Sequence, residues 1–493
     1  MLFNSLQFLF FFVVVTSLYF ALPHKYRWIL LLAASCYFYM AFVPIYILIL
    51  GFTIVIDYFA GRFIEAAEGR RRKLFLVCSI LANIGVLCMF KYYNFLNGNF
   101  NHLLHGFGTN SPLPYLKILL PIGLSFHTFQ AMSYTIEVYR GNQKAERHFG
   151  IYSLYVMFYP QLVAGPIERP QNLLHQFREK FNFDYEKVTG GLRLIVWGLF
   201  KKVVIADRLA ILVDYVYKDP QSHNSRSLII AAIFFTFQIF CDFSGYSDIA
   251  IGTARVMGFT LMKNFDRPFS SLSIAEYWNR WHISLSTWFR DYLFYPLTIS
   301  LNKKRGNRTL KLYLNLFIVF LVSGLWHGAN WTFVVFGALH GFYIVFAIIS
   351  KNFREKIETI IGLAKFPSLS KFIDRVLVFV LVTFALIFFR SDSVRSAVYV
   401  ITRIIKGIPD MLSKLLHHQS LSDNLGISKE NLLFSVFLIL FIEGFSILQG
   451  KINIVEYLKS KPFYLRWAVY VGCVFVILFL GVFEKRQFIY FQF

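Results

Sequence analysis

The fold is decided by residues 312–349, which read LYLNLFIVFLVSGLWHGANWTFVVFGALHGFYIVFAII. Two apolar runs, each long enough to cross much of a hydrocarbon core of about 30 Å as a helix, meet at the short stretch SGLWHGANW. Its histidine, His327, interrupts a sequence that is otherwise typical of membrane-buried helices. Ionisable side chains are costly inside apolar spans, so we interpret His327 as a functional group that faces the protein interior.

The rest of the chain has the composition of a membrane protein. Of its 493 residues, 57% are hydrophobic and only 16% are charged, which is far from the balance of a soluble globular protein. Apolar runs of about 15 to 25 residues recur along the whole length. These features predict an all-α, polytopic integral membrane protein with about 11 to 13 transmembrane or re-entrant helices.

The net charge of +23 does not indicate a nucleic-acid partner, because the basic residues are scattered through short loops between apolar runs. The positive-inside rule explains these loops as cytoplasmic. Two adjacent lysines, Lys201 and Lys202, interrupt the apolar segment 188–216, and we predict that they mark a membrane interface. They, or the basic residues near 303–311, could attract the phosphates of a substrate, although ordinary topology charges explain them as well.

No boundary divides the chain into separate soluble domains. We expect one membrane domain over residues 1–493, with N-terminal scaffold helices over 1–107, a core over 120–350 and C-terminal helices over 373–493. A polar loop is predicted at 403–430. The five cysteines form no CxxC pair and no metal-ligand spacing, so we expect packing roles for them and no metal site.

A second group of polar residues precedes the central hairpin. Ser273 to Glu276 fits the Ser-x-x-Glu capping box, which predicts a helix from there through Tyr292. Glu276 and Arg280 are spaced for an ion pair on one face of this helix. His282 would lie on another face, which we expect it to share with these neighbours: Trp278, Leu285, Ser286 and Phe289.

The histidines differ in how strongly they indicate chemistry. Taken alone, His282 fits an interfacial histidine with a satisfied hydrogen bond at least as well as a site residue. His340, beside Gly341, is more typical of a structural residue. His327 is the strongest candidate, because burial favours the neutral imidazole that a general base requires.

Several enzyme signatures are missing, which weakens the corresponding classes. The sequence has no GxSxG elbow, no HExxH and no phosphate-binding P-loop. One HxxxxD spacing, His418 to Asp423, lies in a polar loop without supporting residues and is best explained by chance. A transporter or flippase, or a non-catalytic assembly scaffold, stays open at this point because either could bury polar residues in broken helices.

The residues also resemble a known family, the membrane-bound O-acyltransferase superfamily. The resemblance rests above all on EYWNRWHISLSTWFRDYLFYPL at 276–297 and SGLWHGANWTFVVFGALHG at 323–341. Further blocks are similar to the bacterial branch that acetylates alginate and peptidoglycan: PIGLSFHTFQAMSYTIEVYRG at 121–141, FYPQLVAGPIERP at 158–170, CDFSGYSDIAIG at 241–252, NFDRPFS at 264–270, FFRSDS at 388–393 and the closing FIYFQF.

The resemblance implies helices around a central tunnel in which His327 is the catalytic histidine and His282 the second site histidine. As residues that line this tunnel we expect Trp278, Ser286, Trp326, Asn330 and Asp242. The family's chemistry implies an acyl thioester donor, acetyl-CoA or an acylated carrier protein, and no tightly bound cofactor.

The resemblance also implies a multi-pass protein of the bacterial inner membrane, in contact with membrane lipid. Its acyl group, usually acetyl, would reach an extracytoplasmic polysaccharide, either directly or through a periplasmic acetyltransferase subunit of the SGNH-hydrolase type. D-alanyl transfer from a carrier protein is the alternative within the same superfamily.

Overall fold

The computed structural model describes residues 1–109, 113–116, 121–163, 165–416, 425–483 and 488–489. Within these ranges the chain forms helices and no strand, which confirms the predicted all-α class. Eight described helices are long and apolar enough to cross a membrane: Tyr46–Ala66, Gly69–Gly106, Ser225–Val256, Arg308–His327, Trp331–Ile349, Pro367–Arg390, Lys429–Gln449 and Phe463–Leu480. The chain is therefore a multi-pass membrane protein, as predicted.

The chain divides into two compact units. Among the described residues, unit 1 comprises Met1–Gly198 and Tyr246–Lys263, and unit 2 comprises Leu199–Gly245 and Asn264–Ile489. One border between them falls within the continuous helix α11, after Gly245.

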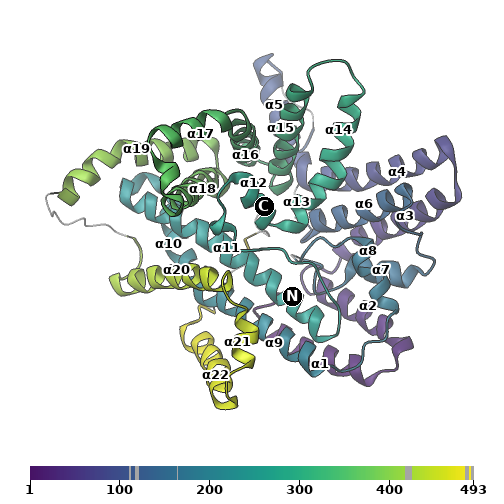
Figure 1. Cartoon of the computed structure of the whole chain (residues 1–493). Helices are drawn as coiled ribbons and strands as arrows, with labels where there is room; N and C mark the ends of the chain where they lie inside the picture. Colours follow the sequence, from purple (N-terminus) through teal and green to yellow (C-terminus); the bar gives the residue numbers. More distant parts are fainter. Residues whose placement is uncertain (110–112, 117–120, 164, 417–424, 484–487, 490–493) are drawn as a thin grey trace. The chain divides into compact units, whose positions relative to one another are not determined.

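Unit 1 contains helices α1 to α8, all of α9 but its last residue, the short helices η1 and η2, and the C-terminal end of α11 (Figure 1). Their bounds are α1 Leu6–Ala21, α2 His24–Met40, α3 Tyr46–Ala66, α4 Gly69–Leu87, the π-helix η1 Cys88–Tyr92, α5 Tyr93–Gly106, α6 Leu124–Arg140, α7 Phe149–Met157, α8 Pro170–Leu173, the 3-10 helix η2 His175–Arg178 and α9 Tyr185–Leu199. Helix α6 begins after Gly123, whose φ of 77° is a left-handed conformation that glycine adopts without steric cost. Helix α6 therefore starts only at Leu124.

Unit 1 buries more polar chemistry than the expected scaffold. Asp57 on α3 is fully buried and accepts hydrogen bonds from Ser79 Oγ at 2.6 Å and Asn83 Nδ2 at 2.9 Å, both on α4. Glu168 is also fully buried and accepts a hydrogen bond from the backbone N–H of Met262. Its burial raises the pKa of Glu168 to about 7, against the lowering effect of its hydrogen bonds.

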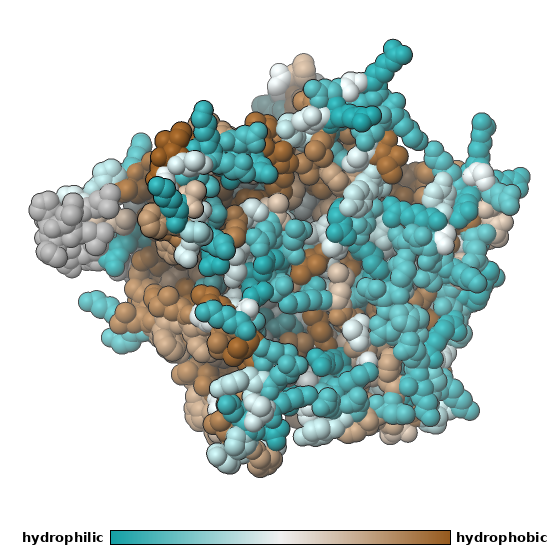
Figure 2. Space-filling model, viewed as in Figure 1, coloured by the Kyte–Doolittle hydropathy of each residue, from teal (hydrophilic) through white to brown (hydrophobic). Residues whose placement is uncertain are grey.

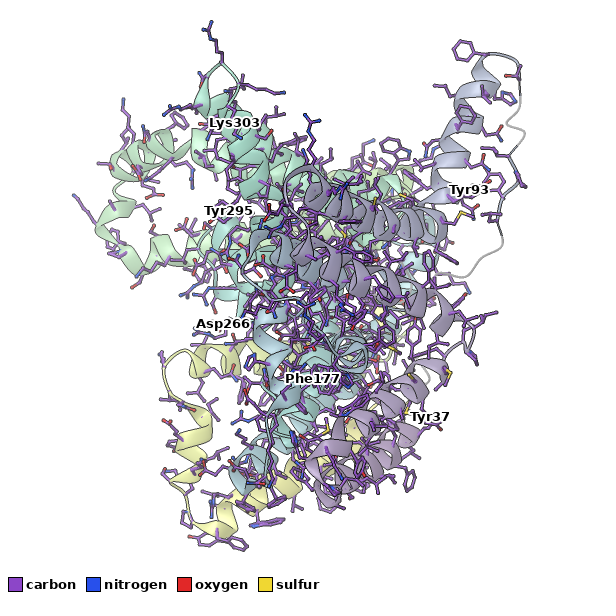
Figure 3. The ribbon with its side chains drawn as sticks, turned by 90° about the vertical axis from the view of Figure 1, so that its right-hand side faces the viewer. Tyr37, Tyr93, Phe177, Asp266, Tyr295 and Lys303 are labelled. Atoms are coloured by element: carbon purple, nitrogen blue, oxygen red, sulfur yellow. The ribbon has the colours of Figure 1, made fainter. Side chains whose placement is uncertain are left out.

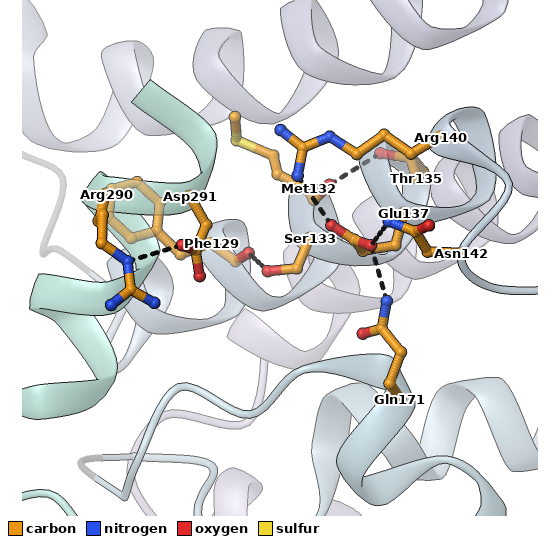
Figure 4. A network of polar contacts seen from close by, with 10 residues as sticks. All are labelled: Phe129, Met132, Ser133, Thr135, Glu137, Arg140, Asn142, Gln171, Arg290 and Asp291. Atoms are coloured by element: carbon orange, nitrogen blue, oxygen red, sulfur yellow. Dashed lines mark hydrogen bonds and ion pairs between the residues drawn. The ribbon is translucent and has the colours of Figure 1, made fainter. Parts of the chain in front are cut away.

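A third polar node of unit 1 closes the end of α6. The Glu137 carboxylate accepts hydrogen bonds from Arg140 at 3.0 Å, Asn142 at 2.9 Å and Gln171 at 2.7 Å, as Figure 4 shows. These contacts tie the end of α6 to the start of α8.

Unit 2 contains the remaining helices. Their bounds are the π-helix η3 Phe200–Ala206, α10 Asp207–Lys218, the 3-10 helix η4 Pro220–Ser222, α11 Ser225–Val256, the 3-10 helix η5 Pro268–Ser270, α12 Ile274–Arg280, α13 Ile283–Phe289, the π-helix η6 Arg290–Phe294, α14 Tyr295–Asn302, α15 Arg308–His327, α16 Trp331–Ile349, α17 Lys351–Ile360, the 3-10 helix η7 Leu363–Lys365, α18 Pro367–Arg390, α19 Val394–Leu416, α20 Lys429–Gln449, α21 Ile454–Lys459 and α22 Phe463–Leu480.

The two adjacent lysines of η3 are buried within the protein, and their place at a membrane interface stays a prediction. Lys201 is 5% and Lys202 2% exposed. Lys201 Nζ donates to Ser244 Oγ at 2.9 Å, and Lys202 Nζ lies 2.9 Å from Asp207 and 2.6 Å from Asp242. The opposite charges on α10 and α11 compensate the cost of burying an ammonium group, which the sequence spacing alone could not reveal.

Helices α15 and α16 lie side by side and cross at two glycines. A Cβ atom on Gly324 would stand 2.3 Å from Phe333 O and 2.7 Å from Gly337 Cα, so neither glycine leaves room for a side chain. Small residues at such a crossing let two backbones approach closely. The close approach brings the end of α15, with His327, against the start of α16.

The C-terminal helices of unit 2 lie in the predicted region 373–493, except that α18 already begins at Pro367. The predicted polar loop at 403–430 is wrong over its first part, because α19 continues to Leu416. Apolar residues recur there at helical spacing, whereas polar composition alone had favoured a loop. The His418 to Asp423 spacing lies outside the described residues.

Apolar side chains cover the outside of several helices of unit 2. Figure 2 shows hydrophobic atoms over α20, where Leu433, Phe437 and Leu440 are 70%, 59% and 66% exposed. Such a surface is expected where a helix faces lipid. Figure 3 labels Tyr295 and Lys303 near the two ends of α14, beyond which the basic loop near 303–311 leads into α15.

Candidate functional site

His327 is the last residue of α15. This helix has 20 residues and is about 30 Å long, so its length matches a hydrocarbon core. The following Gly328 is extended, and Asn330 caps α16 through a hydrogen bond from Thr332 N to its Oδ1 at 3.0 Å. The two apolar helices therefore meet at His327 to Trp331, as predicted, and His327 is held at a helix end between them.

Aromatic rings enclose the His327 imidazole, which is 4% exposed. Ring centroids lie 5.1 Å away for Trp326, 5.8 Å for Phe336 on α16 and 5.4 Å for Phe389 on α18. Packing by the protein itself thus removes this imidazole from water.

His282 lies at a break in the chain where one continuous helix was predicted. Helix α12 ends at Arg280 and α13 begins at Ile283, and His282 between them has φ 44° and ψ 54°. The N–H of Ile283 bonds to the carbonyl oxygen of Asn264 at 2.9 Å instead of continuing the helix. The predicted helix 273–292 is therefore wrong at its centre, because a contact from outside the helix replaces its own hydrogen bond.

The predicted start of this segment is confirmed. The Ser273 side chain accepts a hydrogen bond from Glu276 N at 3.1 Å and caps α12, and Glu276 Oε2 accepts one from Leu272 N at 2.7 Å. Glu276 also pairs with Arg280 at 2.8 Å, the predicted i,i+4 contact. This short helix positions the break, because it ends only two residues before His282.

The structure brings the two predicted site histidines into one aromatic neighbourhood. His282 is fully buried, with the Phe243 ring of α11 at 4.6 Å. The Trp326 ring centroid lies 6.1 Å from that of His282 and 5.1 Å from that of His327, so the two imidazoles are no more than about 11 Å apart. Burial lowers the pKa of His282 to about 3, which keeps it neutral near pH 7.

His340, which the sequence favoured as a structural residue, adjoins the same neighbourhood. Its Nδ1 accepts a hydrogen bond from Trp278 Nε1 at 3.2 Å. The Phe336 ring lies 4.7 Å from His340 and 5.8 Å from His327, so it separates the two imidazoles. Trp278, one of the expected tunnel residues, thereby belongs to the wall that supports α16.

The other expected tunnel residues are engaged in different ways. Ser286 Oγ donates to Trp281 O at 3.2 Å beside the helix break. Asn330 Nδ2 donates to Asp392 O at 3.0 Å, in addition to capping α16. Asp242 pairs with Lys202 at 2.6 Å and accepts a hydrogen bond from Ile489 N at 2.8 Å. The structure thus brings Trp278 and Trp326 to the histidines and uses Asp242 and Asn330 for contacts within the protein.

Sequence reasoning missed two kinds of contributor to this neighbourhood. The aromatic walls Phe243, Phe336 and Phe389 come from three helices and look like ordinary apolar residues in the sequence. Asn264, which contacts His282, appeared only within the block NFDRPFS. Among the described residues, no three His, Cys, Asp or Glu side chains are grouped as metal ligands would be.

The fold and these residues define a multi-pass membrane protein with a buried, aromatic-walled pair of histidines. The family model for MBOAT, the membrane-bound O-acyltransferase family, matches residues 80–389, and the chain belongs to this family. The match includes both histidines and confirms the resemblance seen in the sequence. The protein is an acyltransferase, which removes the transporter and scaffold alternatives.

Three curated relatives illustrate the similarity. The probable alginate O-acetylase of Pseudomonas aeruginosa is 38% identical over 400 residues, 80% of this chain and 73% of the relative. The peptidoglycan O-acetyltransferase of Helicobacter pylori is 32% identical over 457 residues, 85% of this chain and 82% of the relative. The teichoic acid D-alanyltransferase of Streptococcus thermophilus is 32% identical over 270 residues, 51% of this chain and 60% of the relative.

Proposed function

We propose that this protein transfers an acetyl group from a cytoplasmic thioester, acetyl-CoA, to the extracytoplasmic side of the bacterial inner membrane for O-acetylation of a polysaccharide. His327 acts as the general base. The observation that carries the proposal is the buried position of His327 at the end of α15, in one aromatic neighbourhood with His282. Two relatives that match along most of the chain are named for O-acetylation of alginate and of peptidoglycan, and these names support a polysaccharide as the acceptor.

The chemistry follows from a neutral imidazole beside an acceptor hydroxyl. His327 takes the hydroxyl proton while the oxygen attacks the thioester carbonyl carbon, so a C–O bond forms. The C–S bond then breaks, and the leaving thiolate receives the proton from the imidazolium. General-base assistance of this kind contributes about 10² to 10⁴ in rate. The acceptor hydroxyl belongs either to the polymer or to a periplasmic acetyltransferase subunit of the SGNH-hydrolase type that relays the group.

The aromatic walls have a function in this scheme. Phe336 and Phe389 pack against the His327 ring and exclude water from it. A dry site prevents hydrolysis of the thioester and strengthens the electrostatic interactions of the transition state.

The test is to measure transfer from labelled acetyl-CoA in membranes that contain the wild-type chain or His327→Ala. We expect a loss of about 10² to 10⁴ in initial rate with normal abundance in the membrane. His223→Ala is the matched control, because His223 is also buried in unit 2 but packs against Tyr215. Full transfer by His327→Ala would contradict the role of His327 as the base.

The donor is tested in the same membranes. Transfer from acetyl-CoA alone supports the proposal. Transfer that requires an acylated carrier protein would favour the alternative, D-alanyl or related acyl transfer, which the similarity to the teichoic acid D-alanyltransferase supports over about half of the chain. Mass spectrometry of surface polymers from a deletion strain then identifies the acceptor.

A further inference from the structure

The backbone at His282 is held in a conformation that residues other than glycine rarely adopt. Its φ of 44° and ψ of 54° lie in the left-handed region, which disfavours side chains with a Cβ. Such strain persists only where the surrounding structure imposes it, and it is concentrated at functional sites. The group that imposes it here is Asn264, a buried residue with 1% exposure.

Asn264 contacts the His282 segment through both its main chain and its side chain. Its carbonyl oxygen accepts a hydrogen bond from Ile283 N at 2.9 Å. Its side-chain Oδ1 faces three groups: Ser284 N at 3.3 Å, Ser284 Oγ at 3.0 Å and His282 Nδ1 at 3.3 Å. The one asparagine therefore holds both the backbone and the ring of His282.

The backbone amide of Ser284 determines which end of the Asn264 amide faces this cluster. An N–H group can only donate, so the atom opposite it must be the carbonyl oxygen. A flipped amide would place an NH2 donor against a backbone donor in a buried site, at a cost of about 1 to 3 kcal/mol for the unsatisfied group. The Oδ1 atom therefore faces His282 as well.

It follows that His282 Nδ1 is the donor in its contact with Asn264. An oxygen acceptor requires a hydrogen on Nδ1, and a neutral imidazole carries only one N–H. Ser284 Oγ does not reverse this assignment, because its contact with His282 Nδ1 is 3.5 Å whereas its contact with Asn264 Oδ1 is 3.0 Å.

We propose that Asn264 is a positioning residue that fixes His282 in the tautomer with the hydrogen on Nδ1, so that Nε2 acts in the site as a hydrogen-bond acceptor. This inference rests on the proposed acyl transfer for its functional meaning. An acceptor nitrogen binds and orients the hydroxyl that is to be acylated. It cannot donate to the oxyanion that forms on the thioester carbonyl, so that stabilisation must come from other groups.

The protonation state of His282 supports this division of roles. Burial lowers the pKa of His282 to about 3, so the ring does not become a cation that could donate from both nitrogens near pH 7. The carbonyl oxygen of an asparagine is neutral and does not counteract this effect, whereas a carboxylate in its place would.

The direct test is ¹⁵N NMR of the full-length protein, labelled at histidine and reconstituted in lipid. Comparison with His282→Gln identifies the His282 signals. We expect a protonated Nδ1 and an unprotonated Nε2. A wild-type spectrum with the hydrogen on Nε2 would overturn the proposal, whatever the activity of the sample.

Two substitutions of Asn264 distinguish an effect on the position and tautomer of His282 from an effect on folding. Asn264→Leu removes the acceptor, so we expect a mixture of tautomers and a loss in kcat of up to about 10⁴-fold, the effect known for a catalytic histidine held in the wrong tautomer. Asn264→Asp keeps an acceptor oxygen, so the Nδ1–H tautomer should persist with partial activity. Its carboxylate also raises the pKa of His282, so the acidic limb of the pH–rate profile should move to higher pH.

The matched control is Asn315→Leu. Asn315 is an equally buried asparagine in unit 2, and its Nδ2 donates to Phe294 O at 3.0 Å and to Thr298 Oγ1 at 2.6 Å. This variant should leave the His282 tautomer unchanged. An Asn264→Leu protein that retains the Nδ1–H tautomer and full kcat would also overturn the proposal.

The NMR result and the acyl-transfer assay can fail separately. If His327→Ala retains transfer but His282 shows Nδ1–H that depends on Asn264, the proposed base is wrong and the positioning role stands. If His327 is essential but His282 carries its hydrogen on Nε2, the proposed function stands and the role of Asn264 is wrong. Should Asn264→Leu fail to accumulate, the wild-type spectrum and Asn264→Asp decide.

Discussion

Unit 2 buries polar side chains in two different ways. Around Lys202, every charge meets an opposite charge within the chain: Nζ contacts Asp207 and Asp242, and Asp242 also accepts the backbone N–H of Ile489. Around His282 and His327, aromatic side chains pack against the imidazole rings. Phe243 packs against His282, and Phe389 packs against His327.

The comparison distinguishes side chains that stabilise the fold from side chains that surround the proposed catalytic histidines. A matched ion cluster orders the chain, because removing one member leaves an uncompensated buried charge. Aromatic packing removes water from the two imidazoles, and burial lowers the pKa of His282 to about 3, so that ring is neutral near pH 7. Substitutions in the first region should therefore change folding, and substitutions in the second should change the rate.

The largest effect on stability is expected from Lys202→Met. This change leaves Asp207 and Asp242 buried without their cation, which costs about 3 to 5 kcal/mol. We expect lower abundance and a lower Tm in detergent, with normal acyl transfer per folded molecule. A triple variant that also carries Asp207→Asn and Asp242→Asn should recover much of the stability. If Lys202→Met folds normally but has no activity, the two regions are not separate in function.

Gly324→Val should show whether the aromatic region depends on the close approach of α15 and α16. The added Cβ would meet Phe333 O at 2.3 Å and Gly337 Cα at 2.7 Å, both of them backbone atoms that cannot rotate away. Overpacking of this kind costs about 1 to 3 kcal/mol. It should also lower the rate, because it shifts the helix that ends at His327.

The control for this glycine lies on α20. A Cβ on Gly444 has no heavy atom within 4 Å, so Gly444→Ala should leave both stability and rate within a small range of the wild type. Equal losses of rate in Gly324→Val and Gly444→Ala would contradict the packing explanation. Thermal unfolding followed by fluorescence, together with the acetyl-transfer assay, measures both variants.

The sequence predicted the parts of the fold that depend on local pattern. Apolar length gave the spans, and the Ser273 to Glu276 spacing gave the start of α12 and the ion pair with Arg280. His327 was identified because a single ionisable residue stands out between two apolar runs. Each of these signals is contained in fewer than about 40 consecutive residues.

The parts that could not be predicted depend on contacts between distant segments. The break at His282 requires Asn264, eighteen residues earlier, to replace a helical hydrogen bond. The buried state of Lys202 requires Asp242, forty residues later, to reach it from another helix. Two adjacent lysines in an apolar run look the same whether they are exposed at an interface or paired inside the protein.

Trp278→Phe tests the wall behind the histidines with a smaller change. Phenylalanine keeps most of the ring but removes the donor to His340 Nδ1, a contact of 3.2 Å. The loss should cost about 1 to 3 kcal/mol, because a buried acceptor is left without its donor. We expect a lower Tm and a modest fall in rate. A fall in rate as large as that of His327→Ala would place His340 in the chemistry itself and not in the wall.

The smallest effect is expected from Arg280→Gln. The ion pair with Glu276 is partly exposed, with 25% and 32% of the two side chains accessible, so water screens it. Pairs of this kind contribute about 0.2 to 1 kcal/mol. Because Ser273 still caps α12 through Glu276 N, the break at His282 should keep its position and the rate should stay within about twofold of the wild type. Measurement of Tm at low and high salt decides the point: the difference between Arg280→Gln and the wild type should shrink as salt rises. A large loss of rate without a change in Tm would instead show that this charged face, and not only the aromatic enclosure, acts in acyl transfer.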